Sequence, residues 1–274
     1  MEQRLSLREV QLAELNILKH ATDFMDKHGI KYALAYGTLL GAIRHDAFIP
    51  WDDDIDILVP RDDYEKLKAL IKSGVQVSDA NPDIAFLLPG DKGYKYPFVK
   101  AVDLGYAVDD TNEYIDGVEA NLWVDVFPLN HFPDNWHHYN ACYTIIHLFA
   151  KVTQYDVVAF KKGNIKSTLL KVIARTIAFC MGGYQNVAIA ADKISYRMHK
   201  RNKSSNHVGD GAWGRNISYW PLNQTEELIK HRFEDAEFYI PKEYDAVLRH
   251  VYNDYMQIPP VEKRQSHYLQ VHKK

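Results

Sequence analysis

Apolar residues recur at helical spacing near the start of the chain. They stand three or four positions apart, at Leu12, Leu15, Leu18, Ala21 and Met25. Ser6 and Glu9 have the spacing of a capping box, in which each side chain accepts a backbone N–H at the start of a helix. Gly29 follows the last apolar position, and glycine commonly ends a helix. The pattern therefore predicts an opening helix between Ser6 and Gly29.

Short runs rich in β-branched and aromatic residues predict strands in the first half of the chain. These runs cover residues 32–36, 52–59, 97–102 and 122–127. Gly37 and Thr38 follow the first run and precede apolar residues at helical spacing, which predicts a strand, a glycine turn and a helix. A further helix is expected from about Asp62 to Ile71.

After Pro133 the pattern changes to long helical segments. They cover about residues 134–160, 165–181 and 184–200, and a last helix is expected at 242–255. Strands and helices together predict an α/β (α+β) fold, with a mixed sheet flanked by helices. We expect a core formed by residues 1–132 and about 205–274, and a helical subdomain of about 133–204 inserted in it.

Charge is balanced overall but segregated along the chain. The 274 residues carry 33 basic and 36 acidic side chains, so the chain lacks the strongly basic surface of a general nucleic-acid binder. Residues 161–203 nevertheless contain ten Lys and Arg against one acid, Asp192. Two cysteines, Cys142 and Cys180, exclude a disulfide scaffold and a four-cysteine zinc site.

The sequence predicts a cytoplasmic protein without a membrane span. The first thirty residues lack the pattern of a secretory signal. The most apolar stretch, residues 169–181, is interrupted by Lys171 and Arg175, whereas a spanning helix needs about 20 apolar residues. The basic helical segment also contains apolar side chains, which favours either contact with an anionic membrane at its inner face or a solvated helical face beside an acidic surface.

Three aspartates carry the candidate chemistry. Alternate side chains of a strand share a face, so Asp54 and Asp56 are expected to project together while Ile55 and Ile57 face the core. Two carboxylates held this close repel each other unless one is protonated or a cation lies between them. Mg²⁺ prefers such oxygen ligands. Asp125, a charged residue inside an apolar run, is a third candidate ligand.

Simpler interpretations of these acids stay open at this point. A pair of aspartates near the start of a strand is often a solvated edge, and a single acid such as Asp125 is often a paired structural residue. A calcium loop beginning at Asp52 is excluded, because Ile57 stands where glycine is needed and Asp63 where glutamate is expected.

Phosphate-binding groups are predicted close to the aspartates. Gly37 and Thr38 stand at a strand-to-helix turn, where exposed backbone N–H groups attract phosphate. Arg44 and Lys100 are candidate cations for a diphosphate, although either is equally compatible with a surface charge, the interpretation favoured for His45.

Several segments resemble the LicD family of phosphotransferases, which includes the fukutin-related proteins. The resemblance is carried by residues 36–45, 48–57 and 124–129, and by a tail comprising Phe233 and residues 240–245 and 252–256. It leaves the central helices uncovered. The size of the chain is similar to that of the bacterial members, which transfer phosphocholine.

The resemblance implies a nucleotidyltransferase-like core with one metal-dependent site. By this resemblance Asp54, Asp56 and Asp125 would be catalytic and bind Mg²⁺, with Mn²⁺ as an alternative, while Gly37 and Thr38 would hold the donor phosphates. The implied reaction moves phosphocholine from CDP-choline to a sugar hydroxyl of a teichoic acid, a lipopolysaccharide or a capsule, either free or lipid-linked, and releases CMP.

Other functions remain open on the sequence alone. A CDP-linked donor carrying another phospho-alditol group, or transfer of a nucleoside monophosphate from a triphosphate, would use the same aspartates. A glycan-binding scaffold is the non-enzymatic alternative. Choline requires aromatic faces, for which the candidates are Trp51, also expected to bind substrate, Trp123, Tyr219 and Trp220.

Overall fold

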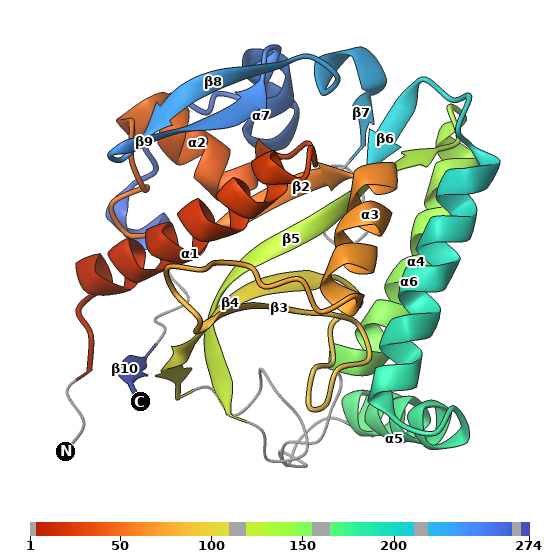
Figure 1. Ribbon diagram of the computed structural model, residues 1–274. Coiled ribbons are helices and arrows are strands. Elements are labelled where there is room, and N and C mark those ends of the chain that lie inside the picture. Colours follow the sequence, from red (N-terminus) through yellow and green to blue (C-terminus); the bar gives the residue numbers. More distant parts are fainter. Residues whose placement is uncertain (1–3, 110–118, 155–164, 211–218, 265–269) are drawn as a thin grey trace.

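The protein is a mixed α/β molecule in which helices cover a curled sheet (Figure 1). The computed structural model describes residues 4–109, 119–154, 165–210, 219–264 and 270–274. The two ends of the chain meet at one side of the sheet, where the backbone N–H of Leu5 donates to the carbonyl of Val271.

One parallel strand pair lies at the centre of the main sheet. The strand order is β1 (Ala33–Leu34), β2 (Asp56–Pro60), β5 (Ala120–Phe132), β4 (Val99–Val108) and β10 (Val271–Lys273). β2 and β5 are parallel, and the other pairs in this order are antiparallel. The parallel pair matters for the site, because it sets the first residue of β2 beside Asp125 of β5.

Shorter strands extend this sheet at both ends of β5. β3 (Ile84–Leu87) pairs with β4. The last residues of β5 pair with β6 (His207–Gly209), which pairs in turn with β7 (Trp220–Pro221).

Two helices cover one side of the sheet (Figure 1). They are α1 (Leu7–Lys27), which packs on β3, β4 and β5, and α3 (Arg61–Lys72), which packs on β2 and β5. The predicted capping box is confirmed, since Ser6 and Glu9 exchange both hydrogen bonds at the start of α1. Leu15 and Leu18 are among the α1 residues buried in the main core.

The helix that directly follows β1 packs beside the sheet against segments near the C-terminus. α2 (Tyr36–His45) contacts α7 (Tyr244–Tyr252) and the hairpin of β8 (Leu228–Phe233) and β9 (Ala236–Pro241). This group encloses the loop between α2 and β2, where the backbone N–H of Glu234 donates to the carbonyl of Asp46.

Three further helices lie at the far end of β5 (Figure 1). They are α4 (Trp136–Gln154), α5 (Ile165–Cys180) and α6 (Tyr184–Arg201). Buried charge attaches them to the core, because the carboxylate of Asp192 on α6 pairs with Arg61 and Lys68 of α3. No helix among the described residues combines the length and hydropathy needed to cross a membrane.

The predicted fold class is confirmed, while several element boundaries differ. α2 begins at Tyr36, so that Gly37 lies in its first turn, and β2 begins at Asp56, so that Asp54 precedes the strand. The expected end of the first long helix near residue 160 lies outside the described residues. β4 and β5 extend beyond the predicted runs, because they pair with each other and with several shorter strands that local sequence does not reveal.

Candidate active site

Asp56 and Asp125 are neighbours across the parallel strands β2 and β5. Their Cα atoms are direct partners in the register of the pair, and Lys100 of β4 is the antiparallel partner of Asp125 on its other side. Side chains in register on adjacent strands share a face of the sheet. Two carboxylates and one ammonium group therefore line up across β2, β5 and β4.

Lys100 is the buried cation of this row. Its side chain is 2% exposed, and its Nζ lies 3.3 Å from Oδ1 of Asp125. The same Nζ lies 3.7 Å from the ring centroid of Trp123 and 4.6 Å from that of Tyr96. Cation–π contact and the ion pair together compensate for part of the cost of burying this charge. The interpretation of Lys100 as a surface charge is therefore wrong.

The environment of Asp56 disfavours its ionised form. Burial is the main reason that its pKa is raised well above the usual value, and the charges of Asp54, Asp125, Asp52 and Asp210 add to the effect. Among the described residues, no group donates a hydrogen bond to the buried Oδ1 of Asp56. An acid held like this is stabilised when a cation arrives.

The first turn of α2 lies against the aspartate loop. A Cβ added to Gly37 would come within 2.8 Å of Oδ2 of Asp52, so a larger residue here would require this carboxylate to move. The hydroxyl of Thr38 accepts a 2.9 Å hydrogen bond from the backbone N–H of Asp56. The helix start carries no side-chain cap. Thr38 thus ties α2 to the metal-ligand candidate, while the helix N-terminus presents backbone N–H groups beside it.

These residues fit Mg²⁺ by their chemistry. Carboxylate oxygens are the ligands that this ion prefers, and the orphaned oxygen of Asp56 is an acceptor in need of a cation. In the part of the chain that the structure describes, no three His, Cys, Asp or Glu side chains are already gathered closely enough to hold a metal. Ligands beyond Asp56 and Asp125 would therefore come from movement of the loop carrying Asp54 or from the donor's phosphates.

The other predicted substrate residues lie further from the row. Arg44 donates a 2.8 Å hydrogen bond to the carbonyl of Tyr255 and contacts His45, which joins α2 to the segment after α7. The ring of Trp51 lies 4.3 Å from the guanidinium carbon of Arg264. Tyr219 stacks on Tyr139 at a centroid separation of 4.1 Å. The roles of Arg44 and Trp51 stay predictions.

A buried acid on α1 was not anticipated. Glu14 is 0% exposed, and neither carboxylate oxygen has a hydrogen-bond partner among the described residues. Burial raises its pKa well above the usual value, and the charge of Asp54 adds to this. One turn earlier, the amide of Gln11 donates to the carbonyl of Asp52 at 2.8 Å. The signal was present in the sequence, since both polar residues stand on the apolar face of the predicted helix.

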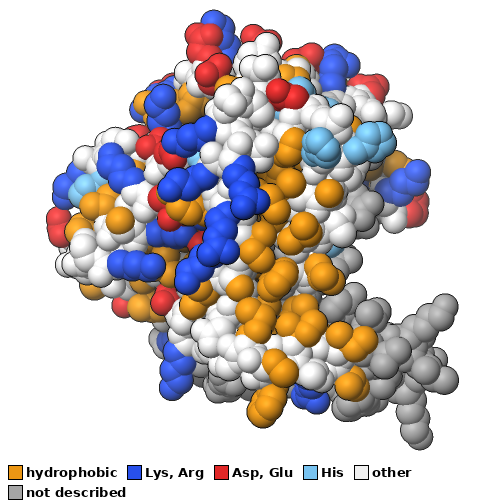
Figure 2. All heavy atoms as spheres, turned by 90° about the vertical axis from the view of Figure 1, so that its right-hand side faces the viewer, with side chains coloured by type: hydrophobic (Ala, Val, Ile, Leu, Met, Phe, Trp, Pro, Cys, Tyr) orange, Lys and Arg blue, Asp and Glu red, His pale blue; other side chains and the backbone are white. Residues whose placement is uncertain are grey.

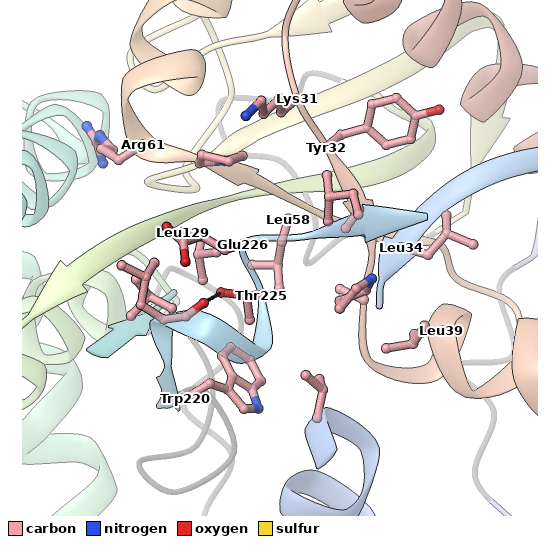
Figure 3. A pocket seen from close by; sticks show the side chains of 18 of the residues that line it. Lys31, Tyr32, Leu34, Leu39, Leu58, Arg61, Leu129, Trp220, Thr225 and Glu226 are labelled. Atoms are coloured by element: carbon pink, nitrogen blue, oxygen red, sulfur yellow. Dashed lines mark hydrogen bonds between the residues drawn. The ribbon is translucent and has the colours of Figure 1, made fainter. Parts of the chain in front are cut away.

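A cavity of about 330 Å³ is lined by Leu58 of β2 and Leu129 of β5 (Figure 3). Its lining includes Tyr36, Trp220 and Tyr252. The hydroxyl of Tyr36 donates to the buried carboxylate of Asp210, which directly follows β6. Sequence reasoning named Trp220 but missed the other three, because segments more than 150 residues apart bring them together.

Comparison with known proteins shows what the segment around this site is similar to. Residues 29–144 match the LicD/FKTN/FKRP nucleotidyltransferase domain. The chain is 27% identical over 271 residues to the lipopolysaccharide cholinephosphotransferase LicD of Haemophilus influenzae, and the alignment covers 97% of each chain. Residues 29–144 are thus similar to the LicD nucleotidyltransferase domain, and this segment contains the aspartate loop, the first turn of α2 and Asp125.

Two further relatives are similar to shorter parts of the chain. An uncharacterized protein of Rickettsia prowazekii is 26% identical over 125 residues, which are 45% of this chain and 43% of its own. One of Rickettsia typhi is 42% identical over 52 residues, which are 19% of this chain and 17% of its own.

Proposed function

We propose that the protein transfers phosphocholine from CDP-choline to a hydroxyl group of a cell-surface glycan and releases CMP. The observation that carries this proposal is the register of Asp56 with Asp125 inside the segment that is similar to the LicD domain. The full-length similarity to a lipopolysaccharide cholinephosphotransferase supports choline as the transferred group and lipopolysaccharide as the first acceptor to test.

The reaction is an in-line displacement at the phosphorus that bears choline. The acceptor's hydroxyl oxygen forms the new bond to phosphorus, and the bond from phosphorus to the oxygen of CMP breaks. In this proposal Asp125 accepts the hydroxyl proton, and the ammonium group of Lys100, 3.3 Å from that carboxylate, offsets negative charge at the reacting centre. Phosphoryl transfer depends on such positioning and charge neutralisation.

Asp54, Asp56 and Asp125 are the residues that would hold Mg²⁺. When bound, the ion supplies positive charge to the phosphoryl oxygens and to the leaving phosphate. The backbone N–H groups at the start of α2 are the second anion-binding element of the proposal, because a helix N-terminus carries partial positive charge. Gly37 keeps this helix end open to a phosphate.

The experiment is a donor panel with the purified protein, Mg²⁺ and acceptor glycan. CDP-choline, CDP-ribitol, CDP-glycerol and nucleoside triphosphates are compared, and CMP and pyrophosphate are quantified. We expect CMP from CDP-choline with phosphocholine on the glycan. If CMP is released only from CDP-ribitol or CDP-glycerol, the transferred group is a phospho-alditol and not phosphocholine. Release of pyrophosphate from a triphosphate would indicate nucleotidyl transfer. Glycan binding without turnover of any donor would favour a scaffold and contradict the proposal.

The acceptor is tested in a second panel of lipopolysaccharide, teichoic acid and capsular polysaccharide. Each polymer is incubated with CDP-choline, and incorporated phosphocholine is measured. We expect lipopolysaccharide to be modified, in keeping with the name of the Haemophilus relative. Modification of teichoic acid alone would retain the reaction and reassign the acceptor.

A docking face for an anionic membrane is part of the proposal. Figure 2 shows hydrophobic side chains gathered in a ridge over the far helices, with Lys and Arg side chains along its edge. The exposed apolar residues on α4 and α5 include Ile145, Leu148, Val172, Ile173 and Phe179. Phe179 is 86% exposed, an arrangement that is costly in water and favourable at a lipid interface.

The charge beside the ridge selects an anionic lipid surface. Exposed cations recur along α6 at helical spacing, at Lys193, Arg197, Lys200 and Arg201. The one acid of residues 161–203, Asp192, is buried and paired with Arg61 and Lys68, so it does not neutralise this stripe. Each cation near an anionic surface contributes about 1 kcal/mol to binding.

Cosedimentation with vesicles tests the docking face. We expect the protein to bind vesicles that contain an anionic phospholipid and to bind neutral vesicles weakly. A variant with both Arg197→Glu and Lys200→Glu should lose this binding, whereas exposed lysines elsewhere, changed in Lys27→Glu with Lys242→Glu, should leave it intact. Equal binding to both kinds of vesicle, or equal loss in both variants, would contradict the docking face and leave the donor chemistry unaffected.

A further inference from the structure

The cavity and the aspartate row belong to the same face of the sheet. Side chains alternate along a strand, so Leu58 shares the face of Asp56 on β2, and Leu129 shares the face of Asp125 on β5. Both leucines line the cavity. Figure 3 shows Leu58 and Trp220 beside it. A group attached to a phosphate at the aspartates can therefore extend along the sheet into this space.

Three aromatic side chains from separate segments meet at this cavity. The ring centroids of Tyr36 and Trp220 are 6.1 Å apart. Tyr252 of α7 completes the set. Burial raises the pKa of its hydroxyl, and the charges of Asp56, Asp52 and Asp54 add to this. The three rings therefore line one cavity on the face of the sheet that carries the aspartates.

The backbone of Tyr36 has a strained conformation, which indicates that the surrounding structure holds this residue in place. Tyr36 begins α2 with φ at 45°, in the left-handed region that bulky residues rarely adopt. Such strain persists where surrounding structure demands it, and it is concentrated at functional sites. Here it accompanies a tyrosine hydroxyl that donates to Asp210, while the ring contacts Phe127 and Trp220.

The charge around the cavity favours an organic cation over an anion. Asp210 is 2% exposed and lies behind the ring of Tyr36, and Asp63 and Glu226 line the cavity itself. The Lys and Arg residues in the lining are Lys31, which is exposed, and Arg61, which is neutralised by Asp192 and Glu65. A quaternary ammonium group has no N–H to donate and is bound by aromatic faces with nearby negative charge.

We infer that Tyr36, Trp220 and Tyr252, with the carboxylate of Asp210 behind them, form the subsite for the trimethylammonium head of the donor. The inference rests on the proposed function, since it takes the transferred group to be phosphocholine. Its volume of about 330 Å³ lies at the lower end of the roughly 300–1,000 Å³ that small-molecule sites occupy. Leu34, Leu39 and Leu58 supply the apolar wall that contacts the methyl groups.

Calorimetric binding of four compounds in the presence of Mg²⁺ tests the subsite. They are CDP, CDP-choline, CDP-glycerol, and the CDP ester of 3,3-dimethylbutanol, in which carbon replaces the quaternary nitrogen. We expect CDP-choline to bind roughly tenfold more tightly than both CDP and the carbon analogue, because cation–π attraction needs the charge. Equal affinity for CDP-choline and its carbon analogue would overturn the inference.

Variants at the rings identify the residues. Tyr252 is 37% exposed, so Tyr252→Leu is compatible with folding. It should weaken CDP-choline about fivefold and leave CDP unchanged. Tyr252→Phe keeps the ring and should keep the preference. Tyr244→Leu on the same helix lies outside the cavity lining and serves as the matched control. Melting temperatures establish that each variant is folded.

The results separate the subsite from the function on which it rests. If Tyr252→Leu and Trp220→Leu both retain the full preference for CDP-choline over CDP, the subsite is wrong, while CDP binding and CMP release leave the proposed function standing. If none of the CDP compounds binds, the proposed function is contradicted, and the subsite falls with it.

Discussion

Asp56 on β2 stands directly beside Asp125 on β5, and these two strands form the parallel pair at the centre of the sheet. Parallel pairing brings the two backbones into register at the start of β2, where the backbone N–H of Asp125 donates to the carbonyl of Ile55. The closeness of the two acids is therefore a property of the sheet and does not depend on a flexible loop.

Replacing Asp56 by Asn should raise the stability of the protein while lowering its activity. The pKa of Asp56 is raised, so the folded state binds the proton more tightly than the unfolded state, and its stability falls as pH rises above the ordinary value of 3.8. Asp56→Asn removes this cost. We expect a higher melting temperature than the wild type at pH 8 without divalent ions, and loss of activity by more than about a hundredfold.

The effect of Mg²⁺ on the melting temperature is a second test of Asp56. Ligand binding to the folded state raises the melting temperature, so Mg²⁺ should stabilise the wild type and have little effect on Asp56→Asn. Asp235→Asn, whose side chain is 70% exposed in the wild type, should respond to Mg²⁺ as the wild type does. A lower melting temperature for Asp56→Asn under metal-free conditions at pH 8 would contradict the assignment.

Lys100 should be important for stability through Asp125. Lys100→Met removes the ammonium group 3.3 Å from the carboxylate of Asp125, and breaking a buried ion pair by removing one partner typically costs about 3 kcal/mol or more. In an Asp125→Asn background the same change should cost far less. Chemical denaturation of the four proteins of this cycle measures the coupling. Additive effects would show that the pair is not coupled.

Gly37 should have two separable roles. In Gly37→Ala the new Cβ would lie 2.8 Å from Oδ2 of Asp52, so this carboxylate must move. Adding Asp52→Ala removes the clash, and the melting temperature lost in Gly37→Ala should be recovered. Affinity for CDP should stay reduced in the double variant, because a Cβ still crowds the helix N-terminus that attracts phosphate. Recovery of both properties would limit Gly37 to its contact with Asp52.

The aspartates were predictable from sequence because their signal is local. Alternate positions in the run at residues 52–59 place Asp54 and Asp56 on the opposite face from Ile55 and Ile57. Asp125 is a charged residue inside an apolar run. The exact start of β2 was not predictable, since it depends on pairing with β1 and β5. Asp54 consequently lies before the strand, in the same loop as the buried Asp53.

The aromatic cavity was beyond local reasoning for a different physical reason. Trp220 lies on a two-residue strand that pairs only with β6, and Tyr36 was embedded in a motif whose apolar residues predicted only a strand end. Their approach depends on pairing between segments far apart in the chain, and single-segment propensity carries no information on that pairing.

Protonation of His199, at the helical end of the molecule, should lower the stability of the protein at acid pH. This residue is 2% exposed, and its Nδ1 accepts a 3.1 Å hydrogen bond from the backbone N–H of His131. Burial is the main cause that lowers the pKa of His199 to about 4, although Asp62 opposes the shift. The unfolded state, with an ordinary pKa of 6.5, then binds the proton first as pH falls.

Stability should therefore decrease from about pH 6.5 towards pH 4, by up to about 3 kcal/mol from this residue. Asp56 and Glu14, whose pKa values are raised, act in the opposite direction, so the wild-type profile alone does not isolate His199. The difference in stability between the wild type and His199→Gln isolates the effect of His199, because both proteins contain Asp56 and Glu14. Denaturation across this pH range should show the wild type losing more stability than His199→Gln, while His137→Gln, at an exposed position of α4, keeps the wild-type slope. A constant difference at every pH would mean that His199 contributes packing and hydrogen bonding without titrating.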